Sequence, residues 1–485
     1  LTEGWARRFL VAVFRRYTVL FVGYSHDDVV MHYLARALPA SNVAGRFALT
    51  EEGEDGSWDL LGIKPIRFTK GEGDHPFKEL YDGVGRLADR AARGALDWQS
   101  RLAELGSRVP PIDEESVGEV TQALREVYTT RFLLDVARDP AWLRWLNGRK
   151  YLEAIFGPDR LVERDKLLAE WLARTLAIEH SNEVLEVLAE HGLRMSAELW
   201  YALGREIGVV EDKLLDESLL KRWVIILLAS APRHADGHVL MWLAERCAAA
   251  DCIESAVNVF MAMSEHRLNV KRRFSFSGEL GDGRSRQLEA ECGLRIGHWE
   301  LNEVWIKHIR PHLARVAQPL LSGVVVRLEA IYDQLVAWGD ASREYDSLSF
   351  GRSAIEAHEQ DQHPRAEDVL VDVARDVLEW LAVNSIEQLD AWVERLVTSD
   401  APLLRRLAVH AMTVHPVRSP EVCLVWILER VGLFGFSEHH EVYRAVKMKY
   451  VAATDDVRKV IVDAIRAHSP PGSDADASGE RALRR

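Results

Sequence analysis

Three stretches of this sequence combine residue types that could hold a ligand or do chemistry. The first is VLFVGYSHDD, residues 19–28, an apolar run that stops at Gly23 and continues into polar residues. A glycine lets the backbone approach a ligand closely, and the Ser25 hydroxyl can bond a sugar or phosphate oxygen. Asp27 or Asp28 can cap a helix that follows. These residues predict a turn that faces a nucleotide, although an ordinary capped strand-to-helix turn explains the same spacing without a ligand.

The second stretch is HEQDQHPRAED, residues 358–368, which places four metal-binding residue types in one polar segment before a proline. They are His358, Glu359, Asp361 and His363. Their spacing matches neither H-E-x-x-H nor a zinc finger, so a solvated loop between helices is the preferred interpretation over a metal cluster. The adjacent pair His439 and His440 would point in different directions from a helix.

The third stretch is KRRFSFSGELGDGRSR, residues 271–286, in which basic and aromatic residues alternate with glycines. It could grip a phosphate or an acidic partner, but its glycines lack the order of a phosphate-binding loop. A plain surface loop is the alternative. Arginine outnumbers lysine 49 to 12 over the whole chain, which weakens the meaning of any single arginine cluster.

The first stretch lies in a region where strand and helix patterns alternate. Apolar runs predict strands at residues 18–22, 46–49 and 66–68. Amphipathic patterns predict four helices. One ends near Tyr17, and the others cover residues 28–38, residues around Trp58 and residues 76–92. Strands without clean polar alternation are typical of a parallel sheet with helices on both faces. Ligands of such sheets bind at the carboxyl ends of the strands, where Gly23, Tyr24 and Ser25 lie.

Several segments of this region resemble the closing part of the sirtuin-like domain found in bacterial antiphage-defence proteins. They are FLVAVFRRYTVLFVGYSHDDVVMHYLARAL, WDLLGIKPIRF and HPFKELYDGVGRLADRA. The resemblance covers about the first 97 residues and implies a Rossmann-like α/β fold with NAD as substrate. Gly23, Tyr24 and Ser25 stand where the family's glycine-x-serine stretch contacts NAD, and Asp28 would order the turn. The loop of residues 71–75 is placed like the sirtuin loop that borders the adenine.

The resemblance implies no catalytic residue in this chain. The family's glycine-rich phosphate turn, and the histidine and asparagine that cleave the nicotinamide–ribose bond, belong to segments before this point. No G-A-G-x-S-like motif occurs in the sequence, and His26, His32 and His75 do not occupy the family's catalytic position. We therefore expect these 485 residues alone to have no NAD hydrolase activity. Defence-type members resemble the zinc-free sirtuins, so no metal is expected either.

Composition sets limits on the remaining function classes. Asp plus Glu number 75 against 61 Lys plus Arg, and the resulting net charge of −14 argues against nucleic-acid binding. No apolar run reaches the roughly 18 residues of a membrane helix, so no membrane partner is expected. The four cysteines form no CxxC motif, which favours a reducing, cytoplasmic location.

Beyond residue 97 the strand patterns disappear, and the sequence predicts helices. We expect a sirtuin-like part at residues 1–97, a linker at 98–115, a helical domain at 116–465 and a disordered tail at 466–485. The helices are expected at residues 217–231, 239–249, 252–263, 287–297, 299–309, 313–338, 366–381, 386–398, 402–415, 420–429 and 441–453. Their close spacing predicts antiparallel hairpins stacked into an irregular α-solenoid without a strict repeat, so the fold class is mainly α.

Two functions follow from these features of the sequence. The first is the C-terminal portion of an NAD hydrolase that acts in antiphage defence by depleting NAD. Its helical domain would sense a phage protein, regulate the enzyme or assemble a homo-oligomer. The alternative is a helical protein-interaction scaffold that carries a non-catalytic remnant of a nucleotide-binding fold.

Overall fold

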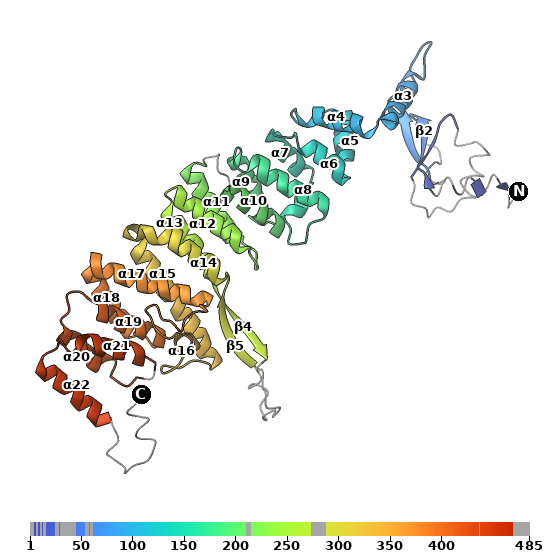
Figure 1. Cartoon of the computed structure of the whole chain (residues 1–485). Coiled ribbons are helices and arrows are strands. Elements are labelled where there is room, and N and C mark those ends of the chain that lie inside the picture. The colour runs from blue at the N-terminus through green and yellow to red at the C-terminus, as the bar shows by residue number, and fades with distance from the viewer. Residues whose placement is uncertain are drawn as a thin grey trace. The chain divides into compact units, whose positions relative to one another are not determined.

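The chain is mainly α-helical, with a small sheet near its N-terminus (Figure 1). The computed structural model describes residues 16–24, 45–53, 62–209, 215–272, 288–435 and 437–468, together with the single residues 4, 5, 8, 9, 12, 29 and 58. Two compact units divide between Leu102 and Ala103. This division lies within the expected linker 98–115, but helix α4 (Ala95–Gly106) runs through it.

The first unit contains a three-stranded parallel sheet in the order β1-β2-β3. The strands are β1 (Val19–Phe21), β2 (Arg46–Glu51) and β3 (Lys64–Phe68), and helix α3 (Lys78–Ala92) follows them. These bounds lie within two residues of the predicted strands. The helices predicted at residues 28–38 and around Trp58 lie almost entirely outside the described residues.

The second unit is built from helices that are mostly eight to 19 residues long. Its α-helices are α5 (Glu114–Ala123), α6 (Val127–Leu134), α7 (Ala141–Gly148), α8 (Glu163–Trp171), α9 (Ser181–Glu190), α10 (Ala197–Val209), α11 (Glu217–Ala229), α12 (Gly237–Ala249), α13 (Ile253–Met263), α14 (His298–Val304), α15 (Leu313–Trp338), α16 (Ser347–Phe350), α17 (Ala366–Asn384), α18 (Ile386–Val397), α19 (Pro402–Val414), α20 (Pro420–Arg430), α21 (His439–Lys449) and α22 (Asp455–His468). Shorter turns of other helix types are η2 (Glu153–Phe156), η3 (Leu172–Leu176), η5 (Trp305–Ile309) and η6 (Arg310–His312).

These helices pack in the manner of stacked hairpins. Many helices contact the second helix along the chain, as in the series α6, α8, α10, α12 and α14. The series α11, α13, α15, α17, α19 and α21 continues the same pattern. Contacts at this short range in sequence are the mark of an α-solenoid, in which each hairpin covers the next. Asp113 caps the N-terminal end of α5, because its side chain accepts a hydrogen bond from the Ser116 main-chain nitrogen at 2.8 Å.

The prediction that strands end at residue 97 is wrong. Strands β4 (His266–Arg272) and β5 (Leu288–Leu294) form an antiparallel hairpin that packs on α15 and α17. The predicted helix 287–297 is therefore also wrong. In LEAECGL the apolar residues alternate with polar ones, so Ala290 and Cys292 lie on the buried face, which is the period of a strand. Residues 273–287, most of the glycine-rich stretch between these strands, lie outside the described residues.

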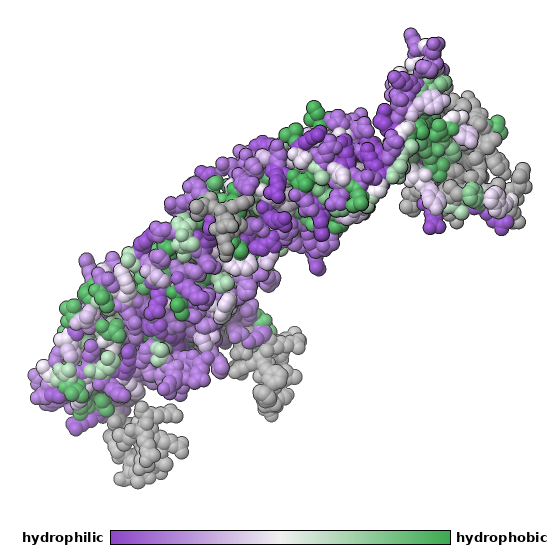
Figure 2. Space-filling model, turned by 45° about the horizontal axis from the view of Figure 1, so that its top comes forward, coloured by the Kyte–Doolittle hydropathy of each residue, from purple (hydrophilic) through white to green (hydrophobic). Residues whose placement is uncertain are grey.

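Large apolar side chains fill one continuous core of the second unit. Trp142, Trp200, Trp223 and Trp305 are each at most 1% exposed, so these large indoles belong to the core. Figure 2 shows hydrophilic residues over most of the visible face of this unit, with hydrophobic residues in small separate groups. None of the described helices combines the length and the apolar character needed to cross a membrane.

All four cysteines are free thiols with buried side chains. Burial raises the pKa of the Cys247 thiol to about 12, and it raises those of Cys292 and Cys423 to about 11. The pKa of Cys252 is also raised, chiefly by burial. These thiols are therefore protonated at neutral pH.

The close approach of α10 and α12 depends on Gly204. A methyl group at this position would collide with the side chain of Val239. We expect Gly204→Ala to lower the free energy of unfolding by about 1–3 kcal/mol, the usual cost of an overpacked core. Urea denaturation followed by circular dichroism measures this change.

Gly118 in α5 provides the matched control, because a methyl group there would meet no atom within 4 Å. Gly118→Ala should leave stability unchanged or raise it by up to about 1 kcal/mol through helix propensity. Equal stability of the two variants would contradict the close packing of α10 on α12.

Candidate functional site

The structure places two of the predicted NAD-contacting residues, Gly23 and Tyr24, after the carboxyl end of β1. Gly23 follows β1 in the left-handed conformation, with φ at +77°, and a methyl group built there meets no atom of a described residue within 4 Å. Tyr24 is 48% exposed, and its ring lies 6.3 Å from that of Phe21. Ser25 and Asp28 lie outside the described residues. The positive φ of Gly23 is what a tight turn requires, with or without a ligand.

The four residues of the predicted polar loop do not form a metal cluster. Residues 351–365 are a loop between α16 and α17, as the solvated-loop interpretation predicted. His358 accepts a hydrogen bond from the Gln360 main-chain nitrogen, and Asp361 accepts one from that of Ser353. These bonds organise the loop itself. Glu359 and His363 are exposed.

A different polar cluster, which no sequence pattern predicted, lies where this loop meets α19 and α21. We call it the Arg406 cluster; it consists of Arg406, Glu441, Glu356, His440 and Arg444. Arg406 Nε lies 2.8 Å from Glu441 Oε2, and Arg406 Nη2 lies 2.9 Å from Glu441 Oε1. The two side chains are 3% and 0% exposed. This is a fully buried, two-pronged ion pair between α19 and α21.

The N–H groups of the Arg406 guanidinium also donate to main-chain carbonyl oxygens of α16 and of the loop 351–365. They reach the carbonyl oxygens of Ser349 at 2.6 Å, Arg352 at 2.9 Å and Ser353 at 3.2 Å. Glu441 in turn accepts from the Ile355 main-chain nitrogen at 3.1 Å. A loop that carries its polar groups into the interior needs such partners, and this ion pair supplies them.

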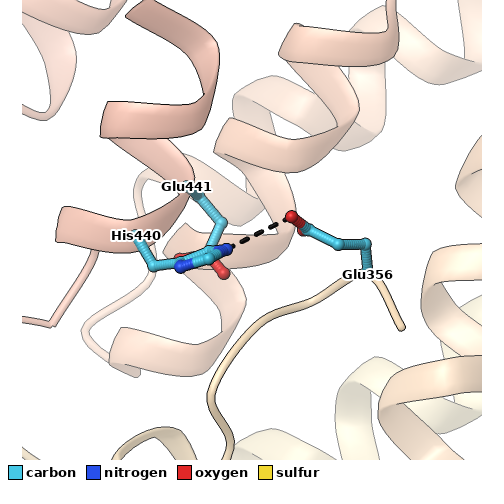
Figure 3. Close-up of side chains that lie close together, drawn as sticks. All are labelled: Glu356, His440 and Glu441. Atoms are coloured by element: carbon cyan, nitrogen blue, oxygen red, sulfur yellow. Dashed lines mark hydrogen bonds and ion pairs between the residues drawn. The ribbon is translucent and has the colours of Figure 1, made fainter. Parts of the chain in front are cut away.

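Glu356 and His440 belong to the less buried part of the cluster. Figure 3 shows the contact between them. Glu356 Oε1 lies 3.2 Å from His440 Nε2 and 3.0 Å from Arg444 Nε. Burial raises the pKa of Glu356, but main-chain and His440 hydrogen bonds and the Arg444 charge together hold it below its usual range. His439, the neighbour of His440, instead packs against the Tyr443 ring at 6.2 Å, so the two histidines do point apart as predicted.

Carboxylate and imidazole atoms of Glu356, His440 and Glu441 lie within 4.8 Å of one another, close enough for one metal ion. Arg406, however, occupies both oxygens of Glu441, and Arg444 lies against Glu356. Two guanidinium charges next to the site would repel a divalent cation. The donor set therefore fits an internal ion-pair network better than a metal centre.

The cluster also lacks the parts of a nucleophilic site. A histidine held by a carboxylate, as His440 is by Glu356, can act as a general base. Among the described residues, however, no serine, threonine or cysteine donates a hydrogen bond to His440. A hollow of about 270 Å³ borders the cluster, and its walls include His358, His439 and His440. The geometry supports positioning of the loop rather than bond cleavage.

Comparison with known proteins adds one distant relative. No family model matches this chain, and no solved structure matches it. The chain is similar to a protein described as uncharacterized protein y4cA, from Sinorhizobium fredii (strain NBRC 101917 / NGR234). The two are 22% identical over 441 residues, which cover 85% of this chain. The chain spans about a third of that protein's length, 34%.

Removing one partner of the buried ion pair should destabilise the array. Glu441→Ala leaves the Arg406 guanidinium buried without its counter-charge, and we expect a loss of about 3–5 kcal/mol in the free energy of unfolding. Chemical denaturation measures it. Glu394, which pairs with Arg430 at 2.7 Å while both are about half exposed, is the control. Glu394→Ala should cost less than about 1 kcal/mol, and a similar cost for both variants would show that the buried pair has no special weight.

Proposed function

We propose that this chain is the C-terminal portion of an NAD hydrolase that acts in antiphage defence by depleting NAD. In this proposal the sheet of the first unit belongs to the NAD-binding domain, and the helical unit senses a phage protein, regulates the enzyme or assembles a homo-oligomer. The observation that supports it most is the parallel order β1-β2-β3, with Gly23 in an open, left-handed turn at the carboxyl end of β1.

The geometry of the parallel sheet supports nucleotide binding at one edge. The carboxyl ends of β1, β2 and β3 meet at this edge, where α/β proteins bind nucleotides. Gly23 presents main chain without a side chain there, so a ribose or phosphate can approach closely. The proposed NAD contacts are Gly23, Tyr24, Ser25 and Asp28. No catalytic residue is assigned within this chain.

The helical unit would then serve recognition rather than chemistry. The Arg406 cluster pairs its charged groups with protein partners, and no described serine, threonine or cysteine donates a hydrogen bond to His440, so the cluster positions a loop. Stacked hairpins expose long surfaces that suit protein partners. The match to this chain covers 34% of the relative from Sinorhizobium fredii, which agrees with a helical unit that works within a larger protein.

A second candidate function is a helical interaction scaffold with a non-catalytic nucleotide-binding remnant. The same observation about the Arg406 cluster favours it, because a network without reactive groups is what a scaffold needs. The two candidates differ in whether the sheet edge still binds NAD.

Substitutions at the sheet edge of the full-length protein test NAD binding there. Gly23→Val places a branched side chain in the open space and disfavours the left-handed turn, so NAD affinity should fall by more than for Ser25→Ala. For Ser25→Ala, loss of one hydrogen bond should weaken binding by about 0.5–1.5 kcal/mol, or up to about 3 if the bond is to charge. Calorimetric titration with NAD measures both.

Gly339, at the C-terminal end of α15, controls for backbone strain. It has φ at +89° and equally open surroundings, so Gly339→Val carries the same conformational penalty away from the sheet. The Gly339→Val variant should bind NAD as tightly as the unchanged protein does. If a folded Gly23→Val variant binds NAD with unchanged affinity, Gly23 only forms a turn, and the scaffold function is favoured.

A deletion tests whether the helical unit couples NAD consumption to infection. Removing residues 111–485 from the full-length protein should make NAD consumption independent of infection. Consumption should be either abolished or constitutive. NAD levels in infected and uninfected cells report this. A truncated protein that still responds normally to phage would remove the sensing role and leave oligomerisation as the use of the helices.

A further inference from the structure

A hollow of about 390 Å³ lies between α6, α8 and η3 in the helical unit, and three arginines form part of its wall. Arg131 comes from α6, Arg138 from the loop after α6, and Arg174 from η3. All three side chains lie at exposed positions. We call this feature the three-arginine hollow.

Trp171 fixes the parts of this wall relative to one another. It is the last residue of α8, is 4% exposed, and donates its indole N–H to the Ala137 carbonyl oxygen at 2.7 Å. The bond ties the loop that carries Arg138 to the helix end from which Arg174 follows. Trp171 also lines the hollow, together with Leu134 and Leu167.

Arg174 owes its position to a widened helical turn. Residues 172–176 form a π-helix, in which the Ala177 main-chain nitrogen bonds to the Leu172 carbonyl oxygen at 3.1 Å. Leu172, Ala173 and Leu176 remain buried while Arg174 faces solvent. Single π-turns interrupt α-helices at a cost in stability and are frequent at functional sites.

None of the three guanidiniums forms an ion pair or hydrogen bond with another described residue. Nearby arginines do: Arg205 lies 2.8 Å from Glu170 and 2.9 Å from Glu206. Each of these three guanidiniums therefore keeps its hydrogen-bond donors available, and an anion in the hollow would be attracted by all three charges.

Acidic side chains also line the hollow, and they restrict what can enter. Arg205 already engages Glu170, while Asp135 and Glu179 lie at exposed positions. Their negative charges disfavour a long polyanion, so we expect a small ligand. The size of the hollow is that of a small-molecule site, typically about 300–1,000 Å³.

We propose that the three-arginine hollow binds a phosphorylated small molecule. Guanidinium groups match phosphoryl oxygens in two-pronged hydrogen bonds, which suits a hollow lined by three arginines with no other partner among the described residues. The apolar surface of Leu134, Leu167 and Trp171 would contact the uncharged part of the ligand. This inference does not depend on NAD binding at Gly23, because every residue that carries it lies in the helical unit.

The test uses the full chain and calorimetric titration with ATP, pyrophosphate and adenosine. ATP should bind, adenosine should bind at least about tenfold more weakly, and added salt should weaken ATP binding. Arg174→Gln and Arg138→Gln should each reduce ATP affinity about tenfold or more, since each removes hydrogen bonds to a charged group. Both positions are exposed, so the melting temperature should stay unchanged.

Arg222→Gln on α11 is the matched control, an exposed arginine outside the hollow. Its affinity for ATP should equal that of the unchanged chain. Pyrophosphate binding as tight as ATP, with the same arginine dependence, would identify the phosphoryl group as the whole ligand. Absence of ATP and pyrophosphate binding, or equal weakening by Arg222→Gln, would overturn the proposal. Binding of an acidic peptide in place of both would do the same.

Discussion

A helix in this chain cannot keep its apolar face from water by itself, and each helical hairpin depends on the hairpins beside it for that cover. Contacts run between alternate helices in the two series α6 to α14 and α11 to α21, and buried side chains from Leu105 to Ile461 join one core. Stability is therefore a sum of neighbouring interfaces. Tryptophans reinforce these interfaces, because a buried indole contributes a large apolar area and its N–H must still find a hydrogen-bond acceptor. Trp142 donates to the Arg108 carbonyl oxygen at 2.9 Å and Trp171 to that of Ala137 at 2.7 Å, each across 34 residues.

Near the C-terminal end of the array, buried ion pairs join neighbouring helices in addition to apolar packing. Helix α19 is buried at every position from Pro402 to Thr413, including two consecutive arginines. A polar side chain in such a helix must be paired, and Arg405 and Arg406 find Glu438 and Glu441 at 2.6 and 2.8 Å. The pairs join α19 to the segment that begins α21 and draw the loop 351–365 against the core. This end of the array is thereby held in one arrangement by directional bonds as well as by packing.

Local patterns predicted much of this architecture, and long-range pairing limited the rest. The expected bounds of α15, residues 313–338, agree with the structure because its apolar periodicity continues over 26 residues. The strands around Gly23 were also predicted, and their parallel pairing is confirmed. Strand β5 was missed because seven residues of alternation stand among helical patterns. The Arg406 cluster joins residues 35 and 57 positions apart, a pairing that no local pattern contains. Two arginines inside the apolar LLRRLAVHAM were its only local sign.

The buried cysteines have a practical consequence for following this protein in motion. A thiol reacts with maleimide or iodoacetamide dyes as its thiolate, and the four native thiols are both covered and raised in pKa. A single cysteine introduced on an exposed helix would therefore take the dye first, with every native cysteine left in place. Pairs of such positions would let fluorescence energy transfer follow the spacing of individual hairpins along the array.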